Sequence, residues 1–192
     1  AGAFRVIGEV SSQYAGLSPD DARLEPLWAL AVSLDVPVGI HIGAGEPGTP
    51  YTASPAFRAR LQSALTLEEV LVRHPKLRLF VENAGYPYRD EMIAMMTQYP
   101  QLHGDVSTIS WVLPRAAFYD YLQALVRAGL GKRVMFGSDQ MRWPEKIGEA
   151  IEAIEQAPFL TEEQKRDILY HNAVRFLRLE QDASRARPSK EE

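Results

Sequence analysis

Residues 36–43 read VPVGIHIG, a nearly continuous apolar run that contains one histidine, His41. Such a run is typical of a strand in a parallel sheet, where helices cover both faces of the sheet. Four further runs of this kind occur at intervals of roughly 35 residues: 4–10, 77–85, 102–107 and 133–139. The run at 36–43 is therefore predicted to be the second of five strands.

Amphipathic segments separate these runs and carry helix start signals. Each predicted start is a capping residue followed by a proline, or by Glu or Gln three positions on: Ser18-Pro19, Ser54-Pro55, Thr66 with Glu69, and Thr161 with Gln164. Helices are also predicted around residues 90–99, over 114–128 and after Pro144, and the last helix is predicted to run to about Leu179. The resulting βαβαβαβαβα order predicts right-handed crossovers and a parallel sheet.

Two architectures fit this order, an open doubly wound sheet and part of a (β/α)₈ barrel. The GxGxxG phosphate loop of dinucleotide-binding sheets is absent, and GAGEPG at 43–48 opens no immediate helix. The strand spacing suits a barrel, but a full barrel takes about 250 residues and eight strands. We therefore predict the α/β class and an incomplete TIM barrel over residues 1–180, with a polar tail over residues 181–192.

The composition is that of an ordinary globular protein and restricts the metal chemistry. The chain has 192 residues, a formal net charge of −4, 46% apolar residues and no cysteine. The slightly acidic balance argues against nucleic-acid binding. No apolar run approaches the roughly 20 residues that span a bilayer. We expect a cytoplasmic protein that acts on a small molecule, and any metal in it must be held by His, Asp or Glu.

Polar side chains gather where the five predicted strands end. In parallel α/β folds the functional residues lie at the carboxyl ends of the strands. The residues found there are Glu9, His41, Glu82, Asn83, Asp105, Ser107, Ser138 and Asp139. Their convergence on one rim predicts a site, although each residue alone is weak evidence for one.

Three of these residues are the strongest candidates for chemistry. His41 is either a core histidine bonded to a backbone carbonyl or a metal ligand, and the long loop at 43–54 favours the functional role. Asp139 is either a turn residue or a ligand that also acts as general base. Asn83 cannot act as a base, so it orients substrate or caps a turn. The other three histidines, His74, His103 and His171, are predicted to be structural.

Several longer segments resemble the amidohydrolase-related metal-dependent hydrolases, a family that includes the aminocarboxymuconate-semialdehyde decarboxylase-like lyases. The segments, in chain order, are VGIHIGAG, RHPKLRLFVENAGYP, QLHGDVSTISW, GKRVMFGSDQMRWP and EEQKRDILYHNAVRFLRL. The resemblance implies a (β/α)₈ barrel with a divalent metal, usually zinc, at the carboxyl rim. By that matching His41 takes the fifth-strand ligand position and Asp139 the eighth-strand position.

The chain departs from the family pattern at two places. No His-x-His pair, the first-strand ligands of the family, occurs in it. The strands present match the fourth to eighth, so the chain is expected to be the C-terminal portion of a barrel. Asn83 stands where the family often has a histidine that activates water. Glu82 could substitute, but strand alternation is expected to point it away from the face of Asn83.

The leading hypothesis is a zinc-dependent hydrolase of an ester, lactone or amide, with Asp139 as the base. The alternatives are a metal-dependent decarboxylase on the same fold and a catalytically inactive barrel fragment. Two ligands predict weak or absent zinc binding by this chain. Trp111, Arg142 and Trp143 are predicted pocket residues. The two outer strands predict self-association or a strand-donating partner, because their edges are unpaired.

Overall fold

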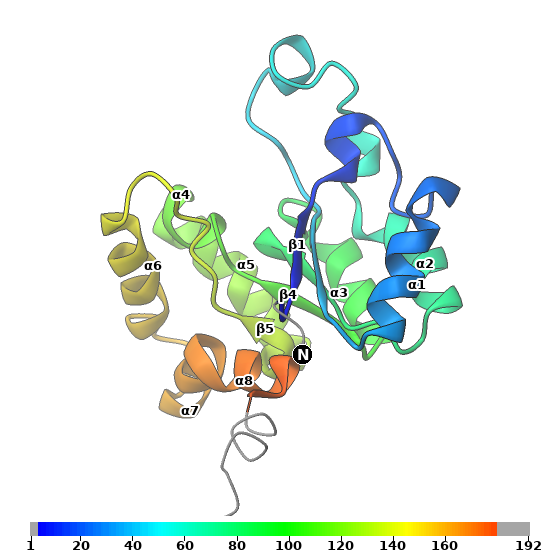
Figure 1. The fold of residues 1–192 in the computed structure, drawn as a ribbon. Helices are drawn as coiled ribbons and strands as arrows, with labels where there is room; N and C mark the ends of the chain where they lie inside the picture. Colours follow the sequence, from blue (N-terminus) through cyan, green and yellow to red (C-terminus); the bar gives the residue numbers. More distant parts are fainter. Residues whose placement is uncertain (1–3, 180–192) are drawn as a thin grey trace, which may run out of the picture.

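The computed structural model describes residues 4–179, which form a five-stranded parallel sheet flanked by helices (Figure 1). The strands are β1 (Ile7–Val10), β2 (Val38–His41), β3 (Leu79–Glu82), β4 (Leu102–Asp105) and β5 (Val134–Met135). They lie side by side in chain order, and each neighbouring pair is parallel. This confirms the predicted α/β class and partial TIM barrel. The tail predicted for residues 181–192 lies outside the described residues.

Eight α-helices are described in residues 4–179: α1 (Glu25–Ser33), α2 (Glu68–Arg73), α3 (Arg89–Gln98), α4 (Ile109–Val112), α5 (Arg115–Arg127), α6 (Glu145–Glu155), α7 (Glu162–Arg166) and α8 (Asn172–Leu177). In Figure 1, α1 to α3 lie on one side of the strands and α4 to α6 on the other, with α7 and α8 below. None of the described helices combines the length and the apolar character needed to cross a bilayer.

Short 3₁₀ segments and one π-helical segment connect these elements. They are η1 (Ser12–Ala15), η2 (Ala22–Leu24), η3 (Thr49–Tyr51), η4 (Ala59–Leu61), η5 (Ala64–Leu67), η6 (Asn83–Gly85), η7 (Gly131–Arg133) and the π-helical η8 (Asp167–His171). Three of them lie in the long connection between β2 and α2, which rises above the strand ends in Figure 1. The connection therefore lies next to the end of β2 that carries His41.

The capping box predicted at Thr161 is confirmed, since its side chain accepts from the Gln164 N–H and Gln164 bonds back. The start predicted at Thr66 is wrong by a few residues. Ser63 caps instead, because its hydroxyl accepts from the Leu65 N–H at 3.1 Å. Thr66 lies inside η5, where its hydroxyl donates to the Ser63 carbonyl.

The two starts predicted at Ser-Pro pairs are also wrong. Ser18 closes a turn, because its carbonyl accepts from the Asp21 N–H at 3.0 Å, and the Asp21 side chain then caps η2. Ser54 likewise closes only a turn to the Phe57 N–H at 2.9 Å. A capping residue followed by a proline favours a first helical turn. The helix continues beyond that turn only where the packing of its side chains stabilises it.

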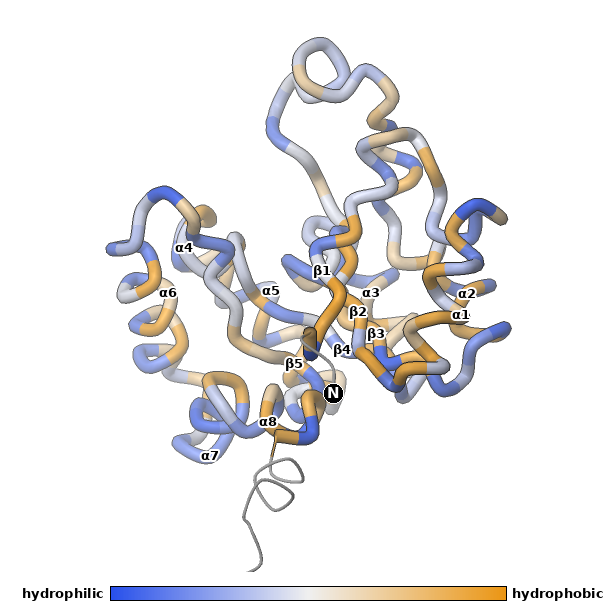
Figure 2. The backbone as a smooth tube through the Cα atoms, viewed as in Figure 1, coloured by the Kyte–Doolittle hydropathy of each residue, from blue (hydrophilic) through white to orange (hydrophobic). Residues whose placement is uncertain are grey.

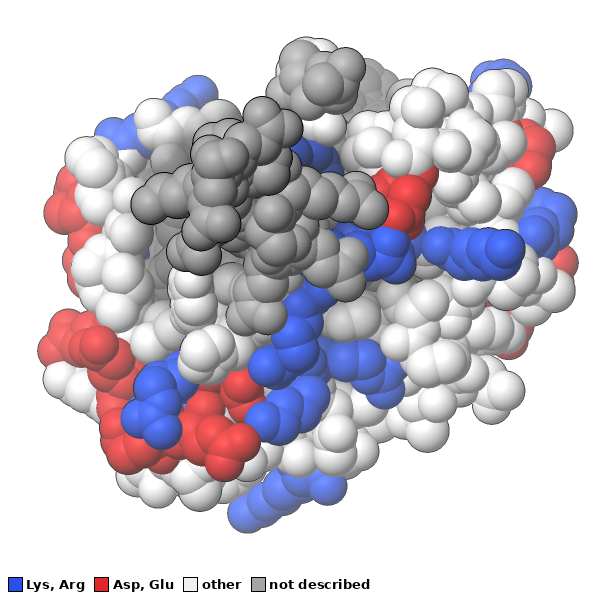
Figure 3. All heavy atoms as spheres, turned by 60° about the horizontal axis from the view of Figure 1, so that its bottom comes forward, with Lys and Arg blue, Asp and Glu red and all other residues white. Residues whose placement is uncertain are grey.

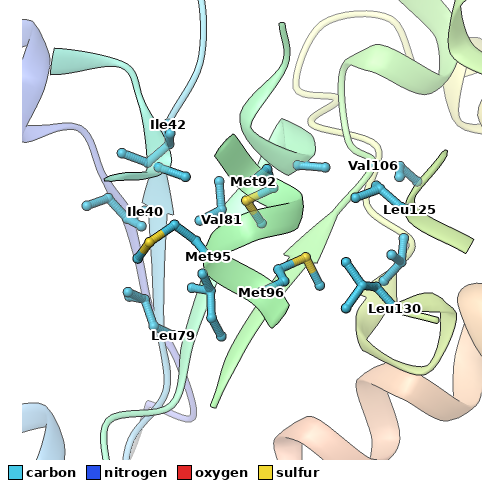
Figure 4. Close-up of a cluster of buried hydrophobic side chains, with 14 of the residues drawn as sticks. Ile40, Ile42, Leu79, Val81, Met92, Met95, Met96, Val106, Leu125 and Leu130 are labelled. Atoms are coloured by element: carbon cyan, nitrogen blue, oxygen red, sulfur yellow. The ribbon is translucent and has the colours of Figure 1, made fainter. Parts of the chain in front are cut away.

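The core lies between the strands and the helices. Figure 2 shows the most hydrophobic backbone along the strands at the centre of the molecule. Ile40, Val81 and Met96 belong to one buried cluster and are fully inaccessible to solvent (Figure 4).

We expect the 192-residue chain to self-associate in solution. Within residues 4–179, β1 and β5 each pair with a neighbour on one side only, so each leaves a row of unpaired backbone groups. Light scattering of the purified chain at increasing concentration measures this. A monodisperse monomer at every concentration would contradict the expectation, since it would mean that both edges are protected.

Acid is expected to destabilise the chain partly through His103, which lies near the start of β4, opposite the His41 end of the sheet. Burial, with a smaller contribution from Arg133, lowers the pKa of His103 from 6.5 to about 4. The unfolded chain therefore binds a proton here at higher pH than the folded chain. Stability falls as the pH drops from about 6.5 through 4, by up to about 3 kcal/mol.

The variant His103→Phe tests this contribution. Its ring keeps an aromatic neighbour for Phe176, whose ring centroid lies 4.5 Å from that of His103. Urea unfolding at pH 7 and at pH 4.5 should show a smaller acid loss for the variant than for the unchanged chain. Equal losses in the two proteins would show that His103 does not account for the acid sensitivity.

Candidate active site

A cavity of about 740 Å³ opens at the carboxyl ends of the strands. All three of the strongest sequence candidates line it: His41, Asn83 and Asp139. Glu9, Tyr14 and Thr108 also line it, together with apolar residues of the loops. The fold therefore brings together residues that lie up to about 130 positions apart in the chain, as a parallel sheet requires.

His41 ends β2 and is 9% exposed. Its Nδ1 lies 2.9 Å from Glu9 Oε1, and its Nε2 lies 3.5 Å from the Tyr14 hydroxyl. A proton on Nδ1 that is donated to Glu9 leaves the lone pair of Nε2 as an acceptor for the Tyr14 hydroxyl. The ring is held by a carboxylate and a phenol, so the alternative of a core histidine bonded to a backbone carbonyl is wrong.

Glu82 reaches the same point from β3. It is the register partner of His41, and one carboxylate oxygen lies 2.6 Å from where a Cβ on Gly39 would stand. Only a glycine at position 39 leaves room for it. Asn83 has a φ of 60° and belongs to the turn η6, so strand alternation does not relate the direction of its side chain to that of Glu82.

Glu9, His41 and Glu82 together form a cluster of potential ligands. One ligand atom from each lies within 4.8 Å of the others. The cluster brings one nitrogen and two carboxylate oxygens, a donor set that suits zinc or a related divalent metal. No other such group of three occurs in the described part of the chain. The residues present therefore fit the metal that the family resemblance implies.

The carboxyl groups in and beside this cluster lie close enough to raise the pKa of Glu82. Burial and the nearby carboxylates of Glu9 and Asp105 raise the pKa of Glu82 to about 9. The hydrogen bond from His41 holds the pKa of Glu9 below its usual value. Two carboxyl groups thus share a half-buried space in which only one is readily ionised. A divalent cation bound there would relieve the repulsion between them.

Asp139 lies across the cavity, beyond the end of β5. Its backbone has a φ of 51°, and its Oδ2 accepts a hydrogen bond from the Thr108 hydroxyl at 2.6 Å. It is not a member of the compact cluster around His41. The geometry places it beside the cavity as predicted, and its role as a metal ligand stays a prediction.

Asn83 supports the rim through its backbone and side chain. Its N–H donates to Asp105 Oδ1 and its own Oδ1 accepts from the Thr108 N–H, both at 3.0 Å. Asp105 also accepts from the Ser107 N–H and hydroxyl, and burial raises the pKa of this aspartate. Asp105 and Ser107 therefore hold the loops together, while the Asn83 Nδ2 remains available as a donor toward the cavity.

The predicted pocket residues line a smaller recess next to the main cavity. It has a volume of about 290 Å³ and shares Thr108 and Asp139 with the larger one. Trp111 and Trp143 meet edge to face with ring centroids 6.4 Å apart, and the Trp111 Nε1–H donates to the Ser138 carbonyl at 2.8 Å. Arg142 also lines this recess.

The sequence profile of the amidohydrolases matches residues 2–179. The chain belongs to the amidohydrolase family. The resemblance read from its motifs is thereby confirmed. No curated protein matches the chain.

Several solved structures share the fold of this amidohydrolase. A TIM-barrel protein of Bordetella bronchiseptica has a TM-score of 0.67 at 24% identity, over 86% of this chain and 55% of that one. A 5-carboxyvanillate decarboxylase of Novosphingobium aromaticivorans, complexed with manganese, has a TM-score of 0.56 at 15% identity, over 85% and 54%. An amidohydrolase of Burkholderia multivorans with bound zinc has 0.59 at 16%, over 88% and 63%. The chain spans about half the length of the solved structures that it matches.

The candidate site also includes residues that carried little or no signal in the sequence. Tyr14 follows β1 in η1 and reaches His41 only through the fold, and its ring packs edge to face on Phe57 at 5.0 Å. Thr108 lies in the loop before α4 and anchors Asp139. Glu82 could have been found from the strand register, which aligns it with His41.

Proposed function

We propose that this chain carries part of the active site of a metal-dependent hydrolase that cleaves an ester, lactone or amide. The observation that carries the proposal is that Glu9 and His41, two members of the cluster, line one cavity with the anchored carboxylate of Asp139. Family membership supports an enzyme of this general class. Because the chain spans about half of the barrels that it matches, hydrolysis by a complete barrel of this kind is likewise proposed.

The proposed metal is a divalent cation such as zinc, held by His41 and Asp139 with Glu9 and Glu82 beside them. When bound, such a cation polarises a carbonyl and lowers the pKa of water towards about 7. Glu9 has a separate role in this proposal, since it fixes the tautomer and orientation of the His41 ring at 2.9 Å.

Asp139 acts as the general base in the proposed reaction. Its Oδ2 is fixed by the Thr108 hydroxyl, so its other oxygen takes the proton from the attacking water. The hydroxide adds to the substrate carbonyl carbon, and the bond to the leaving oxygen or nitrogen then breaks. The proton passes from Asp139 to that leaving atom. The products are a carboxylic acid and an alcohol or amine.

With a cation on His41 Nε2, the Tyr14 hydroxyl would no longer donate to that nitrogen, and it and the Asn83 amide would be the donors available for the developing oxyanion. Both residues line the cavity, and donors aimed at developing charge contribute strongly in a site shielded from water. Ile109, Val112 and Leu113 provide an apolar wall on the same cavity. This lining favours a substrate whose acyl or leaving group is apolar.

The variant Asp139→Asn is expected to lower kcat by about 10²–10⁴, because the amide cannot accept the proton. KM should change much less, since the side chain keeps its size and its contact with Thr108. The measurement is hydrolysis of a panel of aryl esters and lactones by the zinc-loaded chain. The matched control is Asp120→Asn on α5, an exposed carboxylate away from the cavity. Equal loss in both variants would contradict a role of Asp139 as base.

A decarboxylase is the second candidate, and one contact favours it. The Asn83 Oδ1 is occupied by the Thr108 N–H, so no proton-accepting group stands where the family resemblance implies a water-activating histidine. Loss of CO₂ needs no activated water. Reactions in H₂¹⁸O separate the two functions: label in the carboxylic product supports hydrolysis. Release of CO₂ from hydroxybenzoates without label would replace the hydrolase proposal.

A further inference from the structure

A second, separate recess lies at the opposite end of the sheet, where β3, β4 and β5 begin. It has a volume of about 290 Å³. Four of its lining residues are cations, and none of the lining residues is Asp or Glu: Arg78, Lys132, Arg175 and Arg178. Figure 3 shows Lys and Arg side chains gathered on this face of the molecule. Nothing in the proposed function uses these residues.

The positive charges outnumber the carboxylates around this recess. Asp35 accepts from both Arg78 and Arg178, and Asp167 accepts from both Lys132 and Arg175. Within residues 4–179, the one further carboxylate paired with these cations is Glu163, which contacts Lys132 at 2.9 Å and is 73% exposed. Arg133, next to Lys132, donates only to backbone carbonyls in the described residues. In the described residues, four cations thus share three carboxylates, and Arg133 adds a positive charge that pairs with none of them.

One of the cations is held in the recess by the fold itself. Arg78 is 15% exposed and donates to the Phe176 carbonyl at 2.6 Å and to Asp35. Burial lowers its pKa, and the charge of Arg178 lowers it further. Such like-charge crowding is unfavourable unless an anion offsets it.

The arginines also retain donors for a ligand. In residues 4–179, Arg175 donates through Nη2 and Arg178 through Nη1, which leaves Nε and the other Nη of each side chain unused. Planar guanidinium groups match the oxygens of a phosphate in pairs. The rings of His103 and Phe176, with centroids 4.5 Å apart, lie beside these groups and provide a less polar wall.

We propose that this recess is a binding site for the phosphate group of a small phosphate monoester. The excess of positive charge favours an anion, and the unused guanidinium donors bind its oxygens. The volume leaves room for an organic group against Phe176 and His103. The site lies at the end of the barrel that is remote from His41, so its ligand would be an effector and not the substrate.

Isothermal titration of the full 192-residue chain tests the proposal. The chain is freed of metal on a chelating resin and titrated with inorganic phosphate and with phenyl phosphate, against sodium chloride of equal ionic strength. The expected result is saturable binding of one phosphate per chain, tighter for phenyl phosphate. Arg178→Gln should weaken it by about tenfold or more, since a hydrogen bond to a charged group is lost.

The matched control is Arg60→Gln, an exposed arginine in η4 away from this recess. It removes the same charge and should leave phosphate affinity unchanged. Equal weakening in Arg60→Gln and Arg178→Gln would overturn the site, because it would show nonspecific charge attraction. Absence of saturable binding by the unchanged chain would overturn it without any variant.

Two further measurements test whether each variant is folded and whether the bound phosphate group belongs to a lipid. Arg175→Gln serves as a second variant, and circular dichroism in phosphate-free buffer checks that each variant is folded. Sedimentation with vesicles that contain phosphatidic acid identifies the source of the phosphate. Vesicle binding that Arg178→Gln abolishes, without binding of phenyl phosphate, would replace the soluble monoester by a lipid headgroup and so overturn the proposal as stated.

Discussion

Replacing His41 by Gln is expected to weaken zinc binding by about 100-fold or more. His41 supplies the one nitrogen of the cluster, and its Nδ1 already holds Glu9 at 2.9 Å. Even a change in the hydrogen-bond partner of a ligand costs roughly 10–100-fold in metal affinity, so loss of the ligand itself should cost at least as much. The unchanged chain should bind zinc weakly but measurably, because the structure places the carboxylates of Glu9 and Glu82 beside the ligands that the sequence suggested.

Competition with a chromogenic chelator measures the zinc affinity. The matched control is His171→Gln, since His171 is exposed at the end of η8 and away from the strand ends. Glu9→Gln should lie between the two variants, because it removes the partner of the ring and keeps the imidazole. Unchanged zinc affinity in His41→Gln would contradict the metal site, and so would an equal loss in His171→Gln.

Replacing Trp28 by Ala should cost about 3–5 kcal/mol of unfolding free energy. Trp28 lies on α1, is completely buried, and donates its indole N–H to the Pro19 carbonyl at 2.9 Å. The substitution leaves a cavity and an unpaired carbonyl together. Because small domains are stable by only about 5–15 kcal/mol, this is a large part of the total.

The control for this substitution is Trp143→Ala. Trp143 is the same residue type but is 51% exposed, so its loss should change stability by less than about 1 kcal/mol. Urea unfolding followed by circular dichroism compares the two variants. If Trp28→Ala does not fold, Trp28→Phe fills most of the space and should show a smaller but clear loss. Similar stability of the two alanine variants would contradict the assignment of Trp28 to the core.

The strands were predictable from sequence because burial on both faces leaves a nearly continuous apolar run. VPVGIHIG at 36–43 gave β2 with its histidine at the strand end, and RVMFGSD at 133–139 gave β5 with Asp139 beyond it. The helix starts predicted at Ser18 and Ser54 were wrong because each prediction rested on only one or two residues. The conformational preference of so few residues is smaller than the free energy of packing an apolar helix face.

The composition of the site was only partly predictable. His41, Asn83 and Asp139 could be placed on one rim from strand ends alone, and they do line one cavity. The contact between Glu9 and His41 depends on how β1 and β2 align, and the approach of Glu82 depends on a missing side chain at Gly39. Neither contact can be predicted from the residues that neighbour either partner in the sequence.

The sequence by itself therefore determined the parallel α/β sheet, the family and the rim on which polar groups meet, because these follow from periodic burial and strand direction. Only the tertiary structure decided which atoms face one another. It joined Glu9, His41 and Glu82 within 4.8 Å, and it left Asp139 across the cavity on the hydroxyl of Thr108. Distances between side chains depend on register, backbone turns and available space, and these exist only once the strands are packed together.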